Sequence, residues 1–393
     1  MALGVYISVP FCRTKCSFCN FASDVFSRTK MQSYVDRVIA DMERAPAVAQ
    51  EFDAELPREV DSIYLGGGTP STLAPEQLVQ LFDSVRRSFS VLPDAEVTVE
   101  CAPGTLTPEM IGTLLRCGVN RVSLGVQSFV DQESRAVGRL HTRQIVLDDI
   151  VRLRAGGINE ISVDLIAGLP HQTRESWIAS LEDVIASGVP HVSVYMLEVD
   201  EDSRLGKELL AGGQRYHAHF VPKEDDVADF YELACERLSA GGIAQYEISN
   251  FARAGHESEH NLKYWTREPY IGFGVDAHSM LPSATRALDA VRFATTDSLE
   301  KFDAGTRLTR TDVTEESALE EEFFLGLRLC RGVALKGLSK KYGSAVHRLE
   351  EQVNSLIATG FLRQVDGSVS LTAKGRLLSN DVFERLLLSG VSS

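Results

Sequence analysis

The first half of the sequence alternates short β-branched segments with longer amphipathic ones, and this alternation constrains the fold more than any other feature. Six segments are predicted to be strands: residues 5–9, 62–65, 96–100, 121–125, 160–165 and 191–195. Five stretches between them have helical periodicity: residues 31–44, 75–88, 107–117, 142–154 and 174–187. The alternation predicts an α/β fold built from βα units on a parallel sheet. Right-handed crossovers would wind six units into a partial (βα)6 barrel, although a flat doubly wound sheet fits the pattern too.

The chain of 393 residues is long enough for such a fold and a smaller second domain, since domains average roughly 150 residues. Its 44% hydrophobic and 24% charged residues are typical of a globular protein, and no apolar run reaches the ~18 residues of a membrane span. The first ten residues lack a basic segment and a small-residue cleavage site. We therefore expect a cytoplasmic protein without a transmembrane segment, with domains at residues 1–300 and 301–393.

The charge of the chain bears on its partners. Forty basic residues against 55 acidic ones give a net charge of −15, which argues against broad binding to nucleic acid. Residues 311–393 hold 10 basic and 11 acidic residues, so this region lacks the positive footprint of a DNA-binding domain. We expect no nucleic-acid partner.

After residue 195 the pattern changes to shorter elements. We predict a helix at residues 225–238, a short strand at 245–248, and then a loop holding His256, His260, Tyr264, Trp265 and the run Gly272-Phe273-Gly274. The glycine run is predicted to be a tight turn, because no helix start follows it. From residue 315 the chain is predicted to be helical again, then to form a β-hairpin at 361–371 with Asp366-Gly367 at its turn, followed by residues 372–388. These elements predict a C-terminal winged-helix-like domain that serves packing or protein contacts.

Three cysteines follow the first predicted strand with the spacing C-x3-C-x2-C: Cys12, Cys16 and Cys19. An odd total of seven cysteines in a long chain argues against a disulfide framework, and thiolates so close together suit iron. Zinc is the alternative, but a structural zinc site normally takes four ligands and the nearest histidine is His141. Three ligands would leave a [4Fe-4S] cluster one open iron, where a small molecule can bind.

Other unusual residues lie at the ends of the predicted strands. A glycine-rich run at residues 66–70 follows the second strand, and Glu100, Gln127 and Asp164 lie at or near the ends of the next three. Because the carboxyl ends of parallel strands share one rim, we expect these residues and the cysteines to form one active face.

Several strings of the sequence resemble one known family. The cysteine motif matches that of radical S-adenosylmethionine (SAM) proteins. Nearly the whole chain is similar to the oxygen-independent coproporphyrinogen oxidase family within that group, and most similar to its heme-chaperone branch. The matching strings are residues 6–11, 66–70, 125–129, 138–141, 164–166, 168–170 and 260–265.

The resemblance implies roles for particular residues. Cys12, Cys16 and Cys19 would hold a [4Fe-4S] cluster whose fourth iron takes the amino and carboxylate groups of SAM. The family pattern carries over nine SAM contacts: Tyr6, Phe18, Gly67, Gly68, Thr69, Glu100, Gln127, Arg139 and Asp164. Glycines would let the backbone approach the methionine moiety closely, and the charged residues would meet its polar groups.

The string 260–265 resembles the H-N-x-x-Y-W motif of the heme-chaperone branch, and it assigns His260 to heme binding. Imidazole can ligate heme iron, while Tyr264 and Trp265 offer flat apolar faces. A hydrogen-bonding role for His260 stays open, and His256 and His278 are competing ligands.

One position separates the two branches of the family. The oxidase motif extends to a fourth cysteine, where this chain has Phe21 preceded by Asn20. The resemblance therefore implies a heme chaperone that binds heme or porphyrin, passes it to acceptor hemoproteins and uses an electron donor. Radical decarboxylation of coproporphyrinogen III is the alternative, and a regulatory module that binds nucleic acid is a more remote one.

Overall fold

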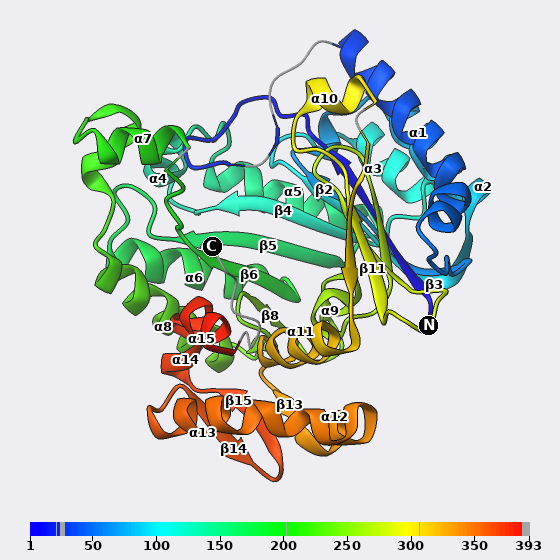
Figure 1. Cartoon of the computed structure of the whole chain (residues 1–393). Helices are drawn as coiled ribbons and strands as arrows, with labels where there is room; N and C mark the ends of the chain where they lie inside the picture. The colour runs from blue at the N-terminus through cyan, green and yellow to red at the C-terminus, as the bar shows by residue number, and fades with distance from the viewer. Residues whose placement is uncertain (21, 24–27, 202, 306, 387–393) are drawn as a thin grey trace.

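The computed structural model describes residues 1–20, 22–23, 28–201, 203–305 and 307–386, so Phe21 lies outside the described residues. Six parallel strands lie side by side in sequence order and curve into a partial barrel (Figure 1). Their bounds are β1 (Leu3–Val9), β2 (Glu59–Gly67), β3 (Ser90–Cys101), β4 (Arg121–Gln127), β5 (Glu160–Ala167) and β6 (His191–Met196). The predicted partial (βα)6 barrel is confirmed.

The helices between these strands cover the outside of the barrel (Figure 1). Their bounds are α1 (Arg28–Glu51), α2 (Pro75–Ser88), α3 (Pro108–Arg116), α4 (Asp131–Ala136), α5 (Arg143–Gly156) and α6 (Arg174–Ser187). Threonine side chains cap α3, α5 and α6 by accepting a backbone N–H from the first turn, which explains why these helices begin where they do. The predictions for 75–88 and 174–187 are correct at both ends.

Alternation along the strands separates two environments. In β1, Leu3, Val5 and Ile7 are fully buried in the core that also contains residues of α1. Tyr6 and Ser8 point the opposite way and line a cavity. Because successive side chains of a strand alternate in direction, the apolar set packs against the helices and the polar set lines the barrel interior.

Further strands extend the sheet at both edges. The bounds are β7 (Ala244–Gln245), β8 (Asn250–Ala252), β9 (Tyr270–Phe273), β10 (His278–Pro282), β11 (Ala290–Ala294) and β12 (Thr309–Val313). The predicted tight turn at residues 272–274 is wrong, because Gly272 and Phe273 belong to β9, which pairs parallel with β1. A side chain at Gly272 would collide with the His278 backbone of the adjacent strand. The predicted strand at 245–248 ends at Gln245, and its partner begins at Asn250.

The segment with His260, Tyr264 and Trp265 is a helix, α9 (Glu259–Thr266), so the predicted loop is wrong. Ser258 caps it by accepting the Asn261 N–H. The helix lies at the amino end of the barrel, where Lys263 Nζ donates to the Ala2 carbonyl at 3.2 Å. The other helices of this half are α7 (Arg204–Leu210), α8 (Glu224–Ala240) and α10 (Leu299–Asp303).

The C-terminal region has a small sheet of its own with helices packed on it. Its elements are α11 (Glu315–Leu327), β13 (Val333–Ala334), α12 (Leu335–Tyr342), α13 (Glu350–Ala358), β14 (Leu362–Val365), β15 (Ser368–Leu371), α14 (Ala373–Leu377) and α15 (Ser379–Leu386). The predicted hairpin is confirmed, and its turn residues Asp366 and Gly367 both have positive φ, as a two-residue hairpin turn requires.

This region packs on the barrel through α9 and α11, where Arg267 Nε lies 3.0 Å from Glu321 Oε2. The predicted domain boundary at residue 301 stays a prediction, and β12 of the large sheet follows it. Residues 387–388 of the last predicted segment lie outside the described residues. Across the described ranges, no helix combines the length and the apolar character needed to cross a bilayer.

Candidate functional site

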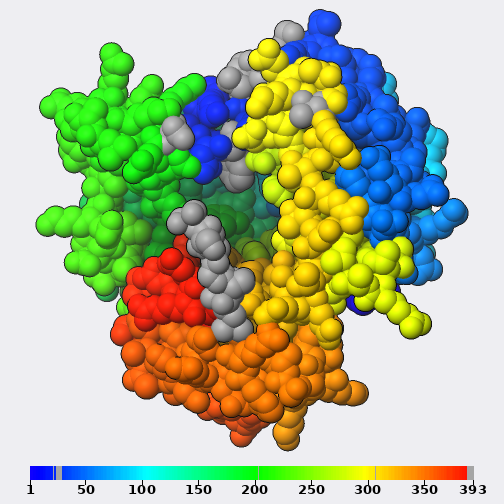
Figure 2. Space-filling view, in the orientation of Figure 1, coloured from blue at the N-terminus to red at the C-terminus, as the bar shows by residue number. Residues whose placement is uncertain are grey.

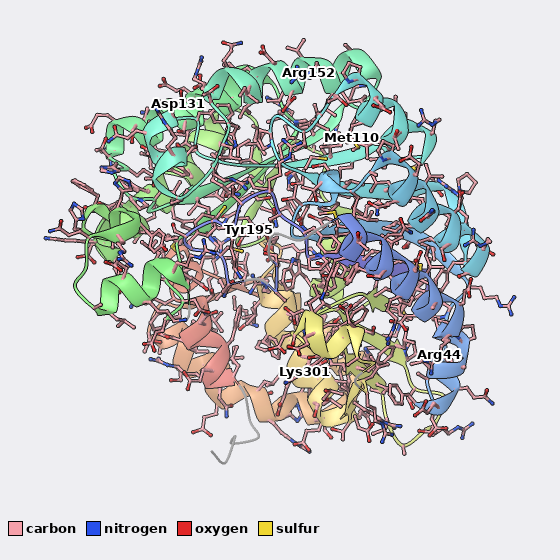
Figure 3. All side chains as sticks on the ribbon, turned by 90° about the horizontal axis from the view of Figure 1, so that it is seen from above. Arg44, Met110, Asp131, Arg152, Tyr195 and Lys301 are labelled. Atoms are coloured by element: carbon pink, nitrogen blue, oxygen red, sulfur yellow. The ribbon has the colours of Figure 1, made fainter. Side chains whose placement is uncertain are left out.

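One cavity of about 380 Å³ opens at the carboxyl ends of β1 to β6. Figure 3 shows the molecule from above, with Tyr195 of the cavity wall near the centre, and Figure 2 shows the face hollowed between α7, α10 and α15. Twelve of the thirteen predicted site residues line it: Tyr6, Cys12, Cys16, Phe18, Cys19, Gly67, Gly68, Thr69, Glu100, Gln127, Arg139 and Asp164. His260 is the one that does not.

All three cysteine sulfurs have a hydroxyl or N–H group beside them, with Ser23 Oγ 3.8 Å from Cys19 Sγ. Thr69 Oγ1 lies 3.7 Å from Cys12 Sγ, and Arg139 Nη1 lies 3.7 Å from Cys16 Sγ. Burial raises the pKa of the Cys12 and Cys16 thiols. Thr69 opposes that rise at Cys12, and Arg139 opposes it at Cys16. An O–H or N–H donor favours the thiolate, which is the form that binds iron. The protein therefore surrounds the cysteines with groups suited to thiolate ligands.

The spacing of possible ligands also bears on the kind of metal site. Among the residues that the structure describes, no three Cys, His, Asp or Glu side chains converge as the ligands of one metal ion would. The thiolates of a [4Fe-4S] cluster each bind a different iron atom, so they need not converge on one point. Three thiols around a shared cavity are compatible with such a cluster.

The glycine-rich loop after β2 is hydrogen-bonded to the cysteine segment, the stretch at residues 9–19 that carries Cys12, Cys16 and Cys19. Gly68 N donates to the Val9 carbonyl at 2.9 Å, and Thr69 N donates to the Phe11 carbonyl at 2.8 Å. A Cβ on Gly68 would lie 2.6 Å from that Val9 oxygen, so a larger residue would push the segment away. Gly67 has φ +98°, which other residues rarely adopt. These glycines thus fix the distance between the loop and the cysteine segment.

Two buried carboxylates line the cavity. Glu100 accepts hydrogen bonds from Tyr64 Oη at 2.9 Å and from Gly67 N at 3.2 Å. Burial, with the negative charge of Asp164, raises the pKa of Glu100 to about 7. Burial likewise raises the pKa of Asp164 to about 6, although Ser123 Oγ donates to it at 3.0 Å. Both groups would be stabilised by a cationic or hydroxyl-bearing ligand.

Arg139 supplies the complementary cation. One of its terminal nitrogens donates to the Gly125 carbonyl and the other faces Cys16. Its Nε is buried and has no hydrogen-bond partner within the described ranges. A buried unpaired N–H is costly, so a bound anionic group would relieve it. The cavity therefore offers a donor for a carboxylate and acceptors for an amino group or ribose, which are the polar parts of SAM.

The structure adds residues that the sequence analysis missed. Tyr64 and Ser123 hold the two carboxylates, and Tyr195 lines the cavity from β6. They alternate with buried apolar residues along their strands, and that pattern could have identified them. Gln127 has φ +69° beside an irregular register between β4 and β5, which directs it to the cavity.

His260 lies apart from this cavity and is 1% exposed. Its Nδ1 is 3.0 Å from Ser62 Oγ and its Nε2 is 2.9 Å from Tyr264 Oη. Burial lowers its pKa to about 3, so the ring is neutral. His256 pairs with Glu160 at 2.9 Å, whereas His278 lines a second cavity. Heme binding by His260 stays a prediction.

Comparison with known proteins agrees with this geometry. The family model of the radical SAM superfamily matches residues 6–184, and that of the HemN C-terminal domain matches residues 313–378. The chain is 35% identical to the heme chaperone HemW of Bacillus subtilis, over 98% of this chain and 99% of that protein. It is 31% identical to the heme chaperone HemW of Escherichia coli, over 98% of each chain.

Among solved structures, coproporphyrinogen III oxidase (HemN) from Escherichia coli, a radical SAM enzyme, superimposes with a TM-score of 0.81. The match covers 98% of this chain and 90% of that one at 22% identity, so it shows the fold alone. Full-length similarity to several HemW proteins is the stronger result. The chain belongs to the HemW family of radical SAM proteins.

Proposed function

We propose that this chain binds a [4Fe-4S] cluster, SAM and heme, and that it transfers heme to acceptor hemoproteins of the cytoplasm. The observation that carries the proposal is the convergence of twelve predicted residues on one cavity. Cys12, Cys16 and Cys19 would hold the cluster. When bound, the cluster supplies an open iron for SAM and a reducible centre that an electron donor can serve.

The residues around the cysteines support the SAM part of the proposal. Arg139 presents a buried unpaired N–H, which suits the carboxylate of SAM. Glu100 and Asp164 would accept hydrogen bonds from its polar hydrogens, and burial raises the pKa of both carboxyl groups in this structure. Phe18 and Tyr6 add apolar surface to the wall.

A second cavity supports the heme part. It has a volume of about 340 Å³, and it shares Tyr6 and Gly67 with the first cavity. Tyr264 and Tyr270 also line it, with their ring centroids 4.7 Å apart. Aromatic side chains are suitable surfaces for a flat apolar ring system. Heme in this cavity would lie beside SAM rather than displace it.

A heme titration tests the proposal. The cluster is reconstituted without oxygen, and hemin is added to the full chain while the Soret band is followed. We expect saturation near one heme per chain, followed by loss of that signal when an apo-hemoprotein is added. A linear absorbance increase with no saturable component would contradict the proposal.

A second assay separates this function from radical decarboxylation. The cluster-loaded chain is given SAM, a strong reductant and coproporphyrinogen III, and the porphyrins are resolved by chromatography after oxidation. We expect unchanged coproporphyrinogen, because Phe21 stands where the oxidase motif has its fourth cysteine. Loss of two carboxyl groups would make the chain an oxidase.

A further inference from the structure

The second cavity contains a histidine at its edge. All nine histidines of the sequence lie within the described residues. Among them, only His278 lines the first or the second cavity. It begins β10, directly after the turn from β9. Because β9 runs parallel to β1, this turn lies at the carboxyl end of the barrel, as the cysteine segment does. His278 is therefore on the same rim as the proposed cluster.

The His278 ring is free to bind a ligand. Its side chain is 68% exposed, and its Nε2 lies 3.8 Å from Asp276 Oδ1, which is beyond hydrogen-bond distance. In the part of the chain that the structure describes, the ring makes no hydrogen bond. A carboxylate this close could accept the N–H of one ring nitrogen, leaving the other nitrogen as a metal ligand.

His260 offers the opposite situation. Both of its ring nitrogens lie within 3.0 Å of hydroxyl groups, those of Ser62 and Tyr264. The ring is also enclosed, since a Cβ built on Gly4 would lie 3.3 Å from its Cε1. Iron ligation would require both a broken hydrogen bond and a path to the buried nitrogen. The same contacts show what His260 does in this structure, which is to hold the Tyr264 hydroxyl and so fix that ring in the cavity wall.

We infer that His278 is the axial ligand through which this chain holds heme iron, with the porphyrin lying against Tyr6, Tyr264 and Tyr270. The inference rests on the proposed function. His260 is then a positioning residue, which acts on heme through Tyr264. The two histidines are expected to differ in the kind of defect that their loss causes, and this makes them a matched pair for a test.

The test is a hemin titration of the full chain as wild type, His278→Ala and His260→Gln, followed by absorbance and electron paramagnetic resonance. We expect His278→Ala to lose the histidine-ligated signature and roughly tenfold or more in affinity, and free imidazole to restore the signature. His260→Gln is expected to bind more weakly and to keep the wild-type signature. Circular dichroism and cluster absorbance check that both variants are folded.

The outcomes are distinct. A wild-type signature and affinity in His278→Ala would overturn the inference and leave heme binding intact. Loss of the signature in His260→Gln alone would make His260 the ligand, which also overturns it. Absence of saturable heme binding in the wild type would contradict the proposed function itself, and the inference would fall with it.

Discussion

The two ends of the barrel differ in how their buried charged residues are paired. At the amino end, Glu96 accepts from the backbone N–H groups of Glu259 and His260 at 3.0 Å, and Arg121 Nη1 lies 3.5 Å from its carboxylate. Lys263 Nζ contacts Asp61 at 2.8 Å and Glu268 at 3.1 Å. At the carboxyl end, the Arg139 Nε is buried without a partner in the described ranges.

This difference separates buried charges that stabilise the fold from buried groups that are available to a ligand. A buried charge with an opposite charge beside it stabilises one arrangement of the fold, whereas a buried N–H without a partner can form a new hydrogen bond with a ligand. The amino end is closed by α9, and the carboxyl end has the cavity. The same residue types therefore support the fold at one end and are proposed to bind cofactors at the other.

The largest expected effect is at the carboxyl end. Cys16→Ser should remove cluster binding entirely while the chain keeps its helical signal, because the barrel core does not depend on that thiol. Iron and sulfide content, absorbance and circular dichroism measure the two properties together. Cys235→Ser, outside both cavities, serves as the control. Unfolding of Cys16→Ser would show that the cluster is structural.

At the amino end, Arg121→Met should lower the free energy of unfolding by about 3–5 kcal/mol, because it leaves the buried Glu96 without its cation. Denaturant titration of the apo chain measures this. Arg143→Met, which removes an ion pair with Asp183 from a half-exposed arginine, should cost about 0–1 kcal/mol. Equal losses in the two variants would remove the distinction between a structural charge and a surface one.

Arg139→Gln should weaken SAM binding by roughly 10- to 100-fold with a smaller effect on stability, because a hydrogen bond to a charged group contributes about 1.5–3 kcal/mol. Calorimetry with the cluster-loaded chain measures the affinity. Arg135→Gln changes an exposed arginine of α4 that bonds to the Asp131 carbonyl, and it should bind SAM as the wild type does. An unchanged affinity in Arg139→Gln would place the SAM carboxylate elsewhere.

The smallest effect concerns pH and the apo chain. Burial raises the pKa of Glu100 from 4.5 to about 7, so its contribution to stability is fully present below pH 4.5 and is lost as the pH rises towards 7. Glu100→Gln should therefore raise the melting temperature relative to wild type at pH 8 and change it little at pH 5. Glu109, in α3, is exposed, so Glu109→Gln should leave the melting temperature unchanged at both pH values. An equal shift of the melting temperature by Glu100→Gln at both pH values would contradict the raised pKa of Glu100.

The sequence predicted which residues meet at one cavity better than it predicted the elements around them. Nine of the twelve cavity residues were identifiable because they lie at or after strand ends, which meet at one rim in any parallel barrel. Tyr6, Phe18 and Arg139 were predicted only from the family resemblance. Tyr64 and Ser123 were missed, since the alternation along their strands places them inside the barrel but does not show which carboxylate each one meets. The helix α9 was predicted as a loop, because one short helix with His260 and Lys263 facing a buried region has no simple apolar stripe.

The sequence by itself determined the βα alternation, the cysteine motif and the rim on which the site lies, because each depends on periodicity or short spacing along the chain. Only the tertiary structure decided how each buried polar group is paired. His260 meets Ser62, which lies 198 positions away, while His278 keeps a free ring beside Tyr264 and Tyr270. Pairing between distant segments depends on packing in three dimensions, and it is this pairing that occupies the ring of His260 and leaves that of His278 available to a ligand.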